Sequence, residues 1–144
     1  MNDIAIYGAG GFGKEIACLI YWINEVKPQW NLIGFFDDGV ECETQISHYG
    51  KVLGGMDTLN SWNKSLSVVF AIANNKVLCK LSSLIANINI QFPNIIAPNI
   101  VIKDVETFKL GNGNIILAGC VVCCDVNIGY FYILNGAVGF GHLV

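Results

Sequence analysis

The 144-residue sequence contains no arginine, so lysine supplies all eight of its basic side chains. Arginine is the residue that forms two parallel hydrogen bonds to a phosphate or to guanine, and this chain lacks that means of contact. Charged residues make up only 13% of the chain, and the net charge is −3. We therefore expect no nucleic acid partner.

Long hydrophobic runs are also missing, although 53% of the residues are hydrophobic. Glycine, asparagine or a charged residue interrupts each run before it reaches the roughly 20 residues that cross a bilayer. The amino terminus, MNDIAIYG, lacks the basic segment and apolar segment of a secretory signal. These absences predict a cytoplasmic protein without membrane insertion, and the apolar content is sufficient for a folded core.

Disulfide and metal patterns are weak in this chain. No second Cys or His pair at zinc spacing accompanies Cys120, Cys123 and Cys124. Free cysteine behaves as a small buried hydrophobic residue, and a core of this size needs no disulfides. We therefore expect that the cysteines are structural thiols and bind no metal. They lie at positions 18, 42, 79, 120, 123 and 124.

Strand-like and helix-like segments alternate in the first two thirds of the chain. Apolar runs predict strands, and apolar residues spaced three or four apart predict helices. A loop containing KVLGG and an extended exit strand, FPNIIAP, complete the pattern. Alternation of this kind predicts an α/β fold, a small Rossmann-like parallel sheet over residues 1–97. The expected strands are 3–8, 30–38 and 66–75, and the expected helices are 11–26, 56–64 and 76–88.

The segment YGAGGFGKE lies between the first expected strand and the first expected helix. It places Gly8, Gly10 and Gly13 in the G-x-G-x-x-G spacing. Glycines there allow a tight turn and a close backbone approach, so that amide groups and the helix N-terminus can bind a phosphate. The alternative is a glycine-rich turn that binds nothing.

Two carboxylates end the second expected strand. Asp37 and Asp38 would lie next to the glycine turn in such a sheet, where a carboxylate can accept a hydrogen bond from a ribose hydroxyl. A solvated acidic loop is the alternative. Only about fifty residues remain for the second half and substrate domain of an NAD-type oxidoreductase, so we disfavour that class.

A six-residue period of apolar residues occupies the last third of the chain. Asp125 is the only charged side chain from residue 110 to the end, and glycine directly follows three of the periodic residues. This period suits neither a helix nor an alternating strand, but it suits the coils of a parallel β-helix, with an ordinary strand-rich segment as the alternative. The periodic residues are Leu110, Ile116, Val122, Ile128, Leu134 and Phe140.

The order of these motifs, from YGAGGFGKE through FFDD, VLGG and AIANN to the repeats, resembles the bacterial sugar acetyltransferases of the sialic-acid O-acetyltransferase type, the PglD-like family. The resemblance covers essentially the whole chain. It implies a nucleotide-sugar-binding domain followed by a left-handed parallel β-helix, assembled as a homotrimer. It also implies that acetyl-CoA binds between neighbouring β-helices and that the acetyl group passes to an amine or hydroxyl of a UDP-sugar or sialic acid.

The resemblance assigns nucleotide-sugar contacts to the glycine turn and to the acidic pair. Phe12 replaces a histidine that is common at its position, which removes a polar contact. Ala73 stands where related sequences have glycine, and its methyl group restricts close backbone approach. Asn74 is available for a base or phosphate contact. The full assigned set is Gly8, Gly10, Gly11, Phe12, Gly13, Asp37, Asp38, Ala73 and Asn74.

The resemblance also implies a catalytic pair near the carboxyl terminus. Asn135 follows the inward Leu134, and His142 lies seven residues beyond Asn135. The histidine would act as the general base, since an imidazole with a pKa near neutrality suits proton removal. Leu143 occupies a position that usually carries an acidic residue, so His142 lacks that support.

Residues 98–144 are expected to form the start of an incomplete β-helix. Residues 110–144 supply about two coils, whereas repeat stacks need at least three units and a cap. We therefore expect a chain that is truncated or covered by partner subunits. The predicted function is an acetyl-CoA-dependent sugar acetyltransferase. The alternative is a nucleotide-sugar-binding module without catalysis.

Overall fold

The computed structural model describes residues 1–135, 139 and 140, and the chain divides into two compact units, Met1–Phe92 and Pro93–Val144. Among helices of the described residues, none is both long and apolar enough to span a bilayer. The boundary after residue 97 stays a prediction, and a strand at Ile95–Ile96 pairs within the second unit.

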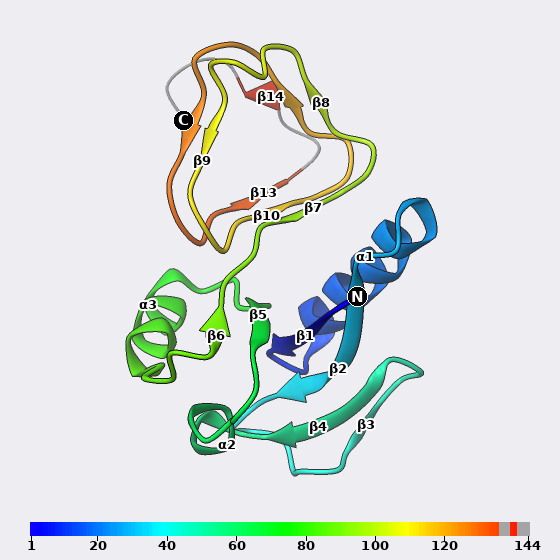
Figure 1. The fold of residues 1–144 in the computed structure, drawn as a ribbon, viewed down its shortest axis with the longest axis vertical. Coiled ribbons are helices and arrows are strands. Elements are labelled where there is room, and N and C mark those ends of the chain that lie inside the picture. Colours follow the sequence, from blue (N-terminus) through cyan, green and yellow to red (C-terminus); the bar gives the residue numbers. More distant parts are fainter. Residues whose placement is uncertain (136–138, 141–144) are drawn as a thin grey trace. The chain divides into compact units, whose positions relative to one another are not determined.

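The first unit is built on one six-stranded sheet (Figure 1). Its strand order is β3-β4-β2-β1-β5-β6, and every neighbouring pair is parallel except β3 with β4. The predicted Rossmann-like parallel sheet is confirmed. In chain order the elements are β1 (Asn2–Tyr7), α1 (Gly11–Val26), β2 (Trp30–Phe36), β3 (Gln45–Ile46), β4 (Gly50–Gly54), α2 (Met56–Asn60), β5 (Leu66–Phe70), α3 (Asn75–Leu84) and β6 (Ile90–Gln91).

The hydrophobic periodicity explains the core of this unit. Helix α1 buries Ile16, Ile20 and Ile23, which share one face at helical spacing. All five residues of β5 are buried, as expected for a strand covered on both faces of a sheet. The carboxyl ends of the central strands are thereby held rigidly where the glycine turn begins.

The segment predicted as a loop around KVLGG forms a strand, so that prediction is wrong. Val52 is fully buried and pairs with Phe35, and Gly54 pairs with Phe36. The two glycines of β4, Gly50 and Gly54, and Gly55 directly after it weakened the sequence signal, because glycine disfavours strands. Tertiary pairing with β2 overrides that preference.

The predicted third strand and third helix are both longer than the observed elements. Strand β5 ends at Phe70, and the segment up to Asn74 is irregular. Helix α3 ends at Leu84. The side chain of Asn74 accepts hydrogen bonds from the N–H groups of Lys76 and Val77, which caps the start of α3 and so keeps Asn74 out of a strand.

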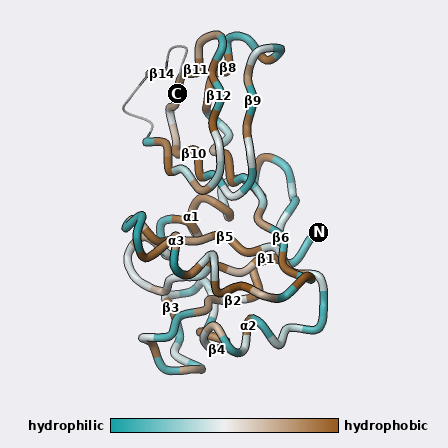
Figure 2. The backbone as a smooth tube through the Cα atoms, turned by 90° about the vertical axis from the view of Figure 1, so that its left-hand side faces the viewer, coloured by the Kyte–Doolittle hydropathy of each residue, from teal (hydrophilic) through white to brown (hydrophobic). Residues whose placement is uncertain are grey.

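The second unit consists of two-residue strands stacked in parallel, the arrangement of a parallel β-helix (Figure 1). Three faces carry the sheets β13-β10-β7, β14-β11-β8 and β12-β9. Figure 2 shows hydrophobic strand segments alternating with hydrophilic turns along this unit. The strands are β7 (Ile95–Ile96), β8 (Val101–Ile102), β9 (Lys109–Leu110), β10 (Ile115–Ile116), β11 (Val121–Val122), β12 (Asn127–Ile128), β13 (Ile133–Leu134) and β14 (Gly139–Phe140).

The six-residue period is confirmed, because each periodic residue ends one of the strands from β9 to β14. Ile116, Val122, Ile128 and Leu134 are buried at the centre of the coils. Paired strands begin earlier than the period, at β7. The six-residue spacing is broken between β8 and β9, because a longer loop, residues 103–108, separates these two strands.

A buried asparagine joins successive coils at one corner. Asn114 is completely buried, and its side chain donates to Asn94 Oδ1 at 3.1 Å and to the Gly129 carbonyl at 2.8 Å. Its Oδ1 accepts from the Tyr132 N–H at 2.8 Å. A buried amide with all its groups bonded stabilises this corner and determines the stacking register.

Candidate functional site

Three strand ends meet around the glycine-rich turn that follows β1. The Gly8 N–H donates to the Phe36 carbonyl at the end of β2, at 2.8 Å. The Ala71 N–H, just after β5, donates to the Tyr7 carbonyl at 2.8 Å. Because β1 lies between β2 and β5, residues after all three strands are gathered at one edge of the sheet.

Two glycines of the turn are required by the fold itself. Gly8 has φ +117°, and a Cβ there would lie 2.8 Å from the Ala71 carbonyl oxygen. A Cβ on Gly13 would collide with the Gly8 carbonyl oxygen, since α1 packs directly against the turn. Backbone packing alone therefore accounts for glycine at positions 8 and 13.

Gly10 and Gly11 have a different environment. A Cβ placed on either residue would meet no atom within 4 Å, so the packing of this chain does not require glycine there. Helix α1 begins at Gly11 and has no side-chain cap, which leaves the amides of its first turn available. An open, uncapped helix start with bare backbone suits the close approach of a phosphate group.

Asp37 is attached to the turn by hydrogen bonds. Its Oδ2 accepts from the Ala9 N–H at 2.9 Å, and its Oδ1 accepts from the Gly39 N–H at 2.8 Å. The half-buried carboxylate is thus oriented beside the glycines. An ionised carboxylate has about four acceptor positions, so each oxygen retains the capacity to accept from a ligand.

Asp38 is oriented by a second set of donors. Its Oδ2 accepts from the Tyr7 hydroxyl, and its Oδ1 accepts from the Met56 N–H at 3.0 Å, at the start of α2. A Cβ on Gly55 would collide with Asp38 Oδ1, so glycine at 55 makes room for this carboxylate. Asp38 nevertheless remains exposed to solvent.

Tyr7 is a site residue that the sequence reasoning missed. Only 2% of its surface is exposed, and its ring packs against Phe70 with the centroids 5.6 Å apart. Burial, followed by the hydrogen bond and the charge of Asp38, raises the pKa of Tyr7 well above its usual value of 10.0. The signal was an aromatic hydroxyl directly before the first glycine of the turn.

The remaining predicted nucleotide contacts are distributed around the same edge. Phe12 is half-buried in the first turn of α1, and Ala73 is exposed after β5. The Oδ1 of Asn74 is occupied in capping α3, so the NH₂ group is the part of this side chain that remains available to a ligand. The structure does not test the predicted contact roles of these residues.

The predicted catalytic pair is only partly described. Asn135 is exposed and directly follows β13. His142 lies outside the described residues, as does Leu143. The catalytic roles of both residues stay predictions.

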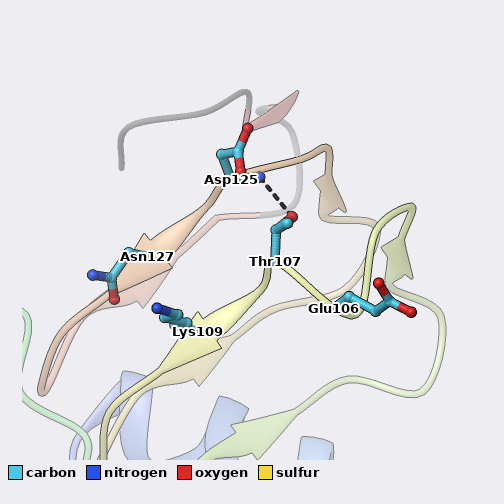
Figure 3. A pocket seen from close by; sticks show the side chains of 5 residues that line it. All are labelled: Glu106, Thr107, Lys109, Asp125 and Asn127. Carbon is cyan, nitrogen blue, oxygen red and sulfur yellow. Dashed lines mark hydrogen bonds between the residues drawn. The ribbon is translucent and has the colours of Figure 1, made fainter.

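The second unit carries a polar pocket of about 360 Å³ at its β9–β12 face (Figure 3). Lys109 and Asn127 extend from neighbouring strands to the same side, and the Asp125 N–H donates to Thr107 Oγ1 at 2.8 Å. Glu106 completes the lining. The side chains of all five lining residues carry groups that can form hydrogen bonds to a ligand.

Cysteines do not gather into a metal centre in the part of the chain that the structure describes. No group of three or more His, Cys, Asp or Glu side chains there could hold a metal ion. Cys120 is buried in the β-helix core, where burial raises the pKa of its thiol, whereas Cys124 is exposed. All six thiols are free.

Known structures share this fold. The acetyltransferase domain of PglB from Neisseria gonorrhoeae FA1090, solved with acetyl coenzyme A, is 22% identical with a TM-score of 0.78, over 99% of this chain and 66% of that one. PerB from Caulobacter crescentus, solved with CoA and GDP-perosamine, is 20% identical with a TM-score of 0.74, over 99% of this chain and 64% of that one. WeeI from Acinetobacter baumannii AYE is 30% identical with a TM-score of 0.73, over 92% of this chain and 60% of that one.

The chain thus spans 66% or less of the length of these three proteins. A search of curated proteins found no match. Residues 3–84 match the family of PglD N-terminal domains, and they contain the glycine turn, Tyr7 and both aspartates. The chain therefore belongs to the PglD N-terminal domain family.

Proposed function

We propose that this protein is an acetyltransferase that moves an acetyl group from acetyl-CoA to an amine or hydroxyl of a nucleotide-linked sugar. The observation that carries this proposal is the open backbone at Gly10 and Gly11 beside two oriented carboxylates. Membership of the PglD N-terminal domain family and the β-helix that follows support it.

In this proposal the first unit binds the nucleotide. The diphosphate lies against the turn, where the free amides at the start of α1 donate to its oxygens. Asp37 and Asp38 accept hydrogen bonds from ribose hydroxyls or from base N–H groups. A UDP-sugar is the ligand that the family resemblance favours, and PerB was solved with a GDP-sugar, so both nucleotides belong in the test.

The proposed acetyl transfer requires a group that first accepts a proton and then returns it. His142 takes a proton from the sugar amine or hydroxyl as that group attacks the thioester carbonyl of acetyl-CoA. The tetrahedral intermediate collapses, the C–S bond breaks, and the protonated His142 gives its proton to the CoA sulfur, so that CoA leaves as the thiol. Asn135 is the proposed partner of His142 in this step. A homotrimer, with acetyl-CoA between neighbouring β-helices, is the proposed assembly.

A nucleotide-sugar-binding module without catalysis is the second candidate. It is favoured by the family match, which covers residues 3–84 and therefore lies entirely within the first unit. An NAD-type binding protein remains disfavoured, because β-helix coils occupy the place of a second nucleotide-binding half.

Calorimetry separates these candidates. The chain is titrated with a UDP-linked amino sugar, GDP-perosamine, acetyl-CoA and NAD, and acetyl transfer is followed by release of the CoA thiol. Binding of a sugar nucleotide and acetyl-CoA, with thiol release, supports the enzyme. Binding of the sugar nucleotide alone supports the module, and binding of NAD alone refutes both.

A further inference from the structure

We propose that Tyr7 is a positioning residue for the nucleotide: its hydroxyl holds the exposed carboxylate of Asp38 in the orientation that accepts hydrogen bonds from the ligand. This inference rests on the proposed nucleotide-sugar function. It adds a buried residue that touches no ligand to the binding apparatus of the first unit.

Asp38 is held from two sides although it is exposed. The Tyr7 hydroxyl, 31 residues earlier in the chain, donates to its Oδ2, and the Met56 N–H donates to its Oδ1 at 3.0 Å. Both donors belong to other elements, β1 and α2. An exposed carboxylate normally samples several rotamers, whereas this one is restricted by two opposed hydrogen bonds.

Tyr7 is itself unable to move. Its backbone pairs with Phe36 of β2 on one side and Phe70 of β5 on the other. Its ring is almost fully buried and lies 5.6 Å from the Phe70 ring, centroid to centroid. The hydroxyl therefore presents a fixed donor at the carboxyl edge of the sheet, and Asp38 takes its orientation from it.

The Tyr7 hydroxyl also remains a donor over the physiological pH range. Burial and the neighbouring carboxylates disfavour the phenolate, so the pKa lies above the ordinary value of 10.0. Two acceptor positions of Asp38 are occupied by protein donors, which leaves about two for a ligand.

A side chain that is already immobilised loses less conformational entropy when a ligand binds. For Asp38 this is worth roughly 2- to 10-fold in affinity.

The test compares Tyr7→Phe with Tyr49→Phe in the full chain. Both substitutions remove one phenolic hydroxyl and keep the ring. Tyr49 precedes the amino end of β4, at the opposite edge of the sheet, and its hydroxyl interacts with Cys18. We expect Tyr7→Phe to weaken binding of UDP-N-acetylglucosamine or GDP-mannose by roughly 2- to 10-fold, measured by calorimetry, and Tyr49→Phe to leave it unchanged.

A double-mutant cycle shows whether Tyr7 acts through Asp38. In an Asp38→Ala background we expect Tyr7→Phe to have no further effect on affinity, because the residue that it positions is gone. A purely structural role of Tyr7 would weaken binding equally in both backgrounds, and that result would overturn the inference.

A second variant keeps the inference testable should Tyr7→Phe fail to fold. Gly55→Ala retains Tyr7 but places a methyl group against Asp38 Oδ1, and Gly55 has φ −108°, which alanine adopts freely. We expect a comparable loss of affinity. Unchanged affinity in both variants overturns this inference alone, whereas a wild-type chain that binds neither nucleotide overturns the proposed function and this inference with it.

Discussion

The carboxylate of Asp37 accepts a hydrogen bond from the backbone N–H of Ala9, 28 residues earlier in the chain, at 2.9 Å. The bond joins the end of β2 to the glycine turn after β1. The residue predicted as a ligand contact is therefore also part of the structure that shapes the turn, and its substitution has two separable consequences.

Asp37→Ala is expected to destabilise the first unit by about 1–3 kcal/mol, because the N–H groups of Ala9 and Gly39 lose a charged acceptor. Urea unfolding followed by tryptophan fluorescence measures this, since Trp22, Trp30 and Trp62 all lie in residues 1–92. Glu25→Ala is the control, because Glu25 is exposed. Equal stability of the two variants would show that the Asp37 bonds contribute nothing.

Gly11→Ala and Gly13→Ala form a matched pair on α1. Alanine at 11 fills open space, so we expect unchanged or slightly higher stability and a loss of sugar-nucleotide affinity of about tenfold or more. Alanine at 13 collides with the Gly8 carbonyl and is expected to cost about 1–3 kcal/mol of unfolding free energy. Calorimetry and urea unfolding separate these effects. Full affinity in Gly11→Ala would argue against a phosphate site at this turn.

Asn114→Ala is expected to weaken the β-helix by about 2–4 kcal/mol, because it leaves Tyr132 N–H and the Gly129 carbonyl without their buried partner. Amide hydrogen exchange reports this as at least a roughly tenfold loss of protection at Tyr132. Asn112→Ala is the exposed control in the same turn. If both variants exchange alike, the asparagine network is not what stabilises the corner.

Alkaline titration reports on Tyr7. The folded-state pKa is raised above the unfolded value of 10.0, so its contribution to stability is complete below about pH 10 and is lost as the pH rises through the folded pKa. We expect one of the five tyrosines to ionise last, by tyrosinate absorbance, and this late step to be absent in Tyr7→Phe. A wild-type titration without the late step would contradict the burial of this hydroxyl.

His142→Ala is expected to reduce acetyl transfer about 10²- to 10⁴-fold while sugar-nucleotide affinity is retained, because a general base acts in the transition state. His48→Ala serves as the control. The His48 ring lies 4.1 Å from that of Tyr49, in the hairpin of the first unit. Acetyl transfer that survives in His142→Ala would remove the proposed mechanism and leave nucleotide binding untouched.

Local patterns in the sequence predicted the elements that depend on neighbours along the chain. Helix α1 has the predicted bounds, Gly11–Val26, because its apolar spacing and glycine start are local signals. The strands from β9 to β14 follow the six-residue period for the same reason. β4 was missed because its glycines are poor strand formers and only pairing with β2 makes it a strand.

The candidate site also has features that local sequence patterns predicted and features that depend on tertiary contacts. The glycine turn and the acidic pair could be found from spacing alone, since the carboxyl ends of adjacent parallel strands must meet. No spacing could separate Gly8 and Gly13, which the packing requires, from Gly10 and Gly11, which it does not. That distinction depends on which atoms approach from β5 and from the turn itself.

The sequence by itself determined the parallel sheet, the nucleotide-type turn and the coil period, because each arises from residue types at short, regular separations. Only the tertiary structure decided that the Tyr7 hydroxyl meets Asp38 and that the Ala9 amide meets Asp37. The physical reason is that these partners, some thirty residues apart, come together only through the lateral pairing of strands. That pairing is stabilised by burial of the whole sheet, which no single segment encodes.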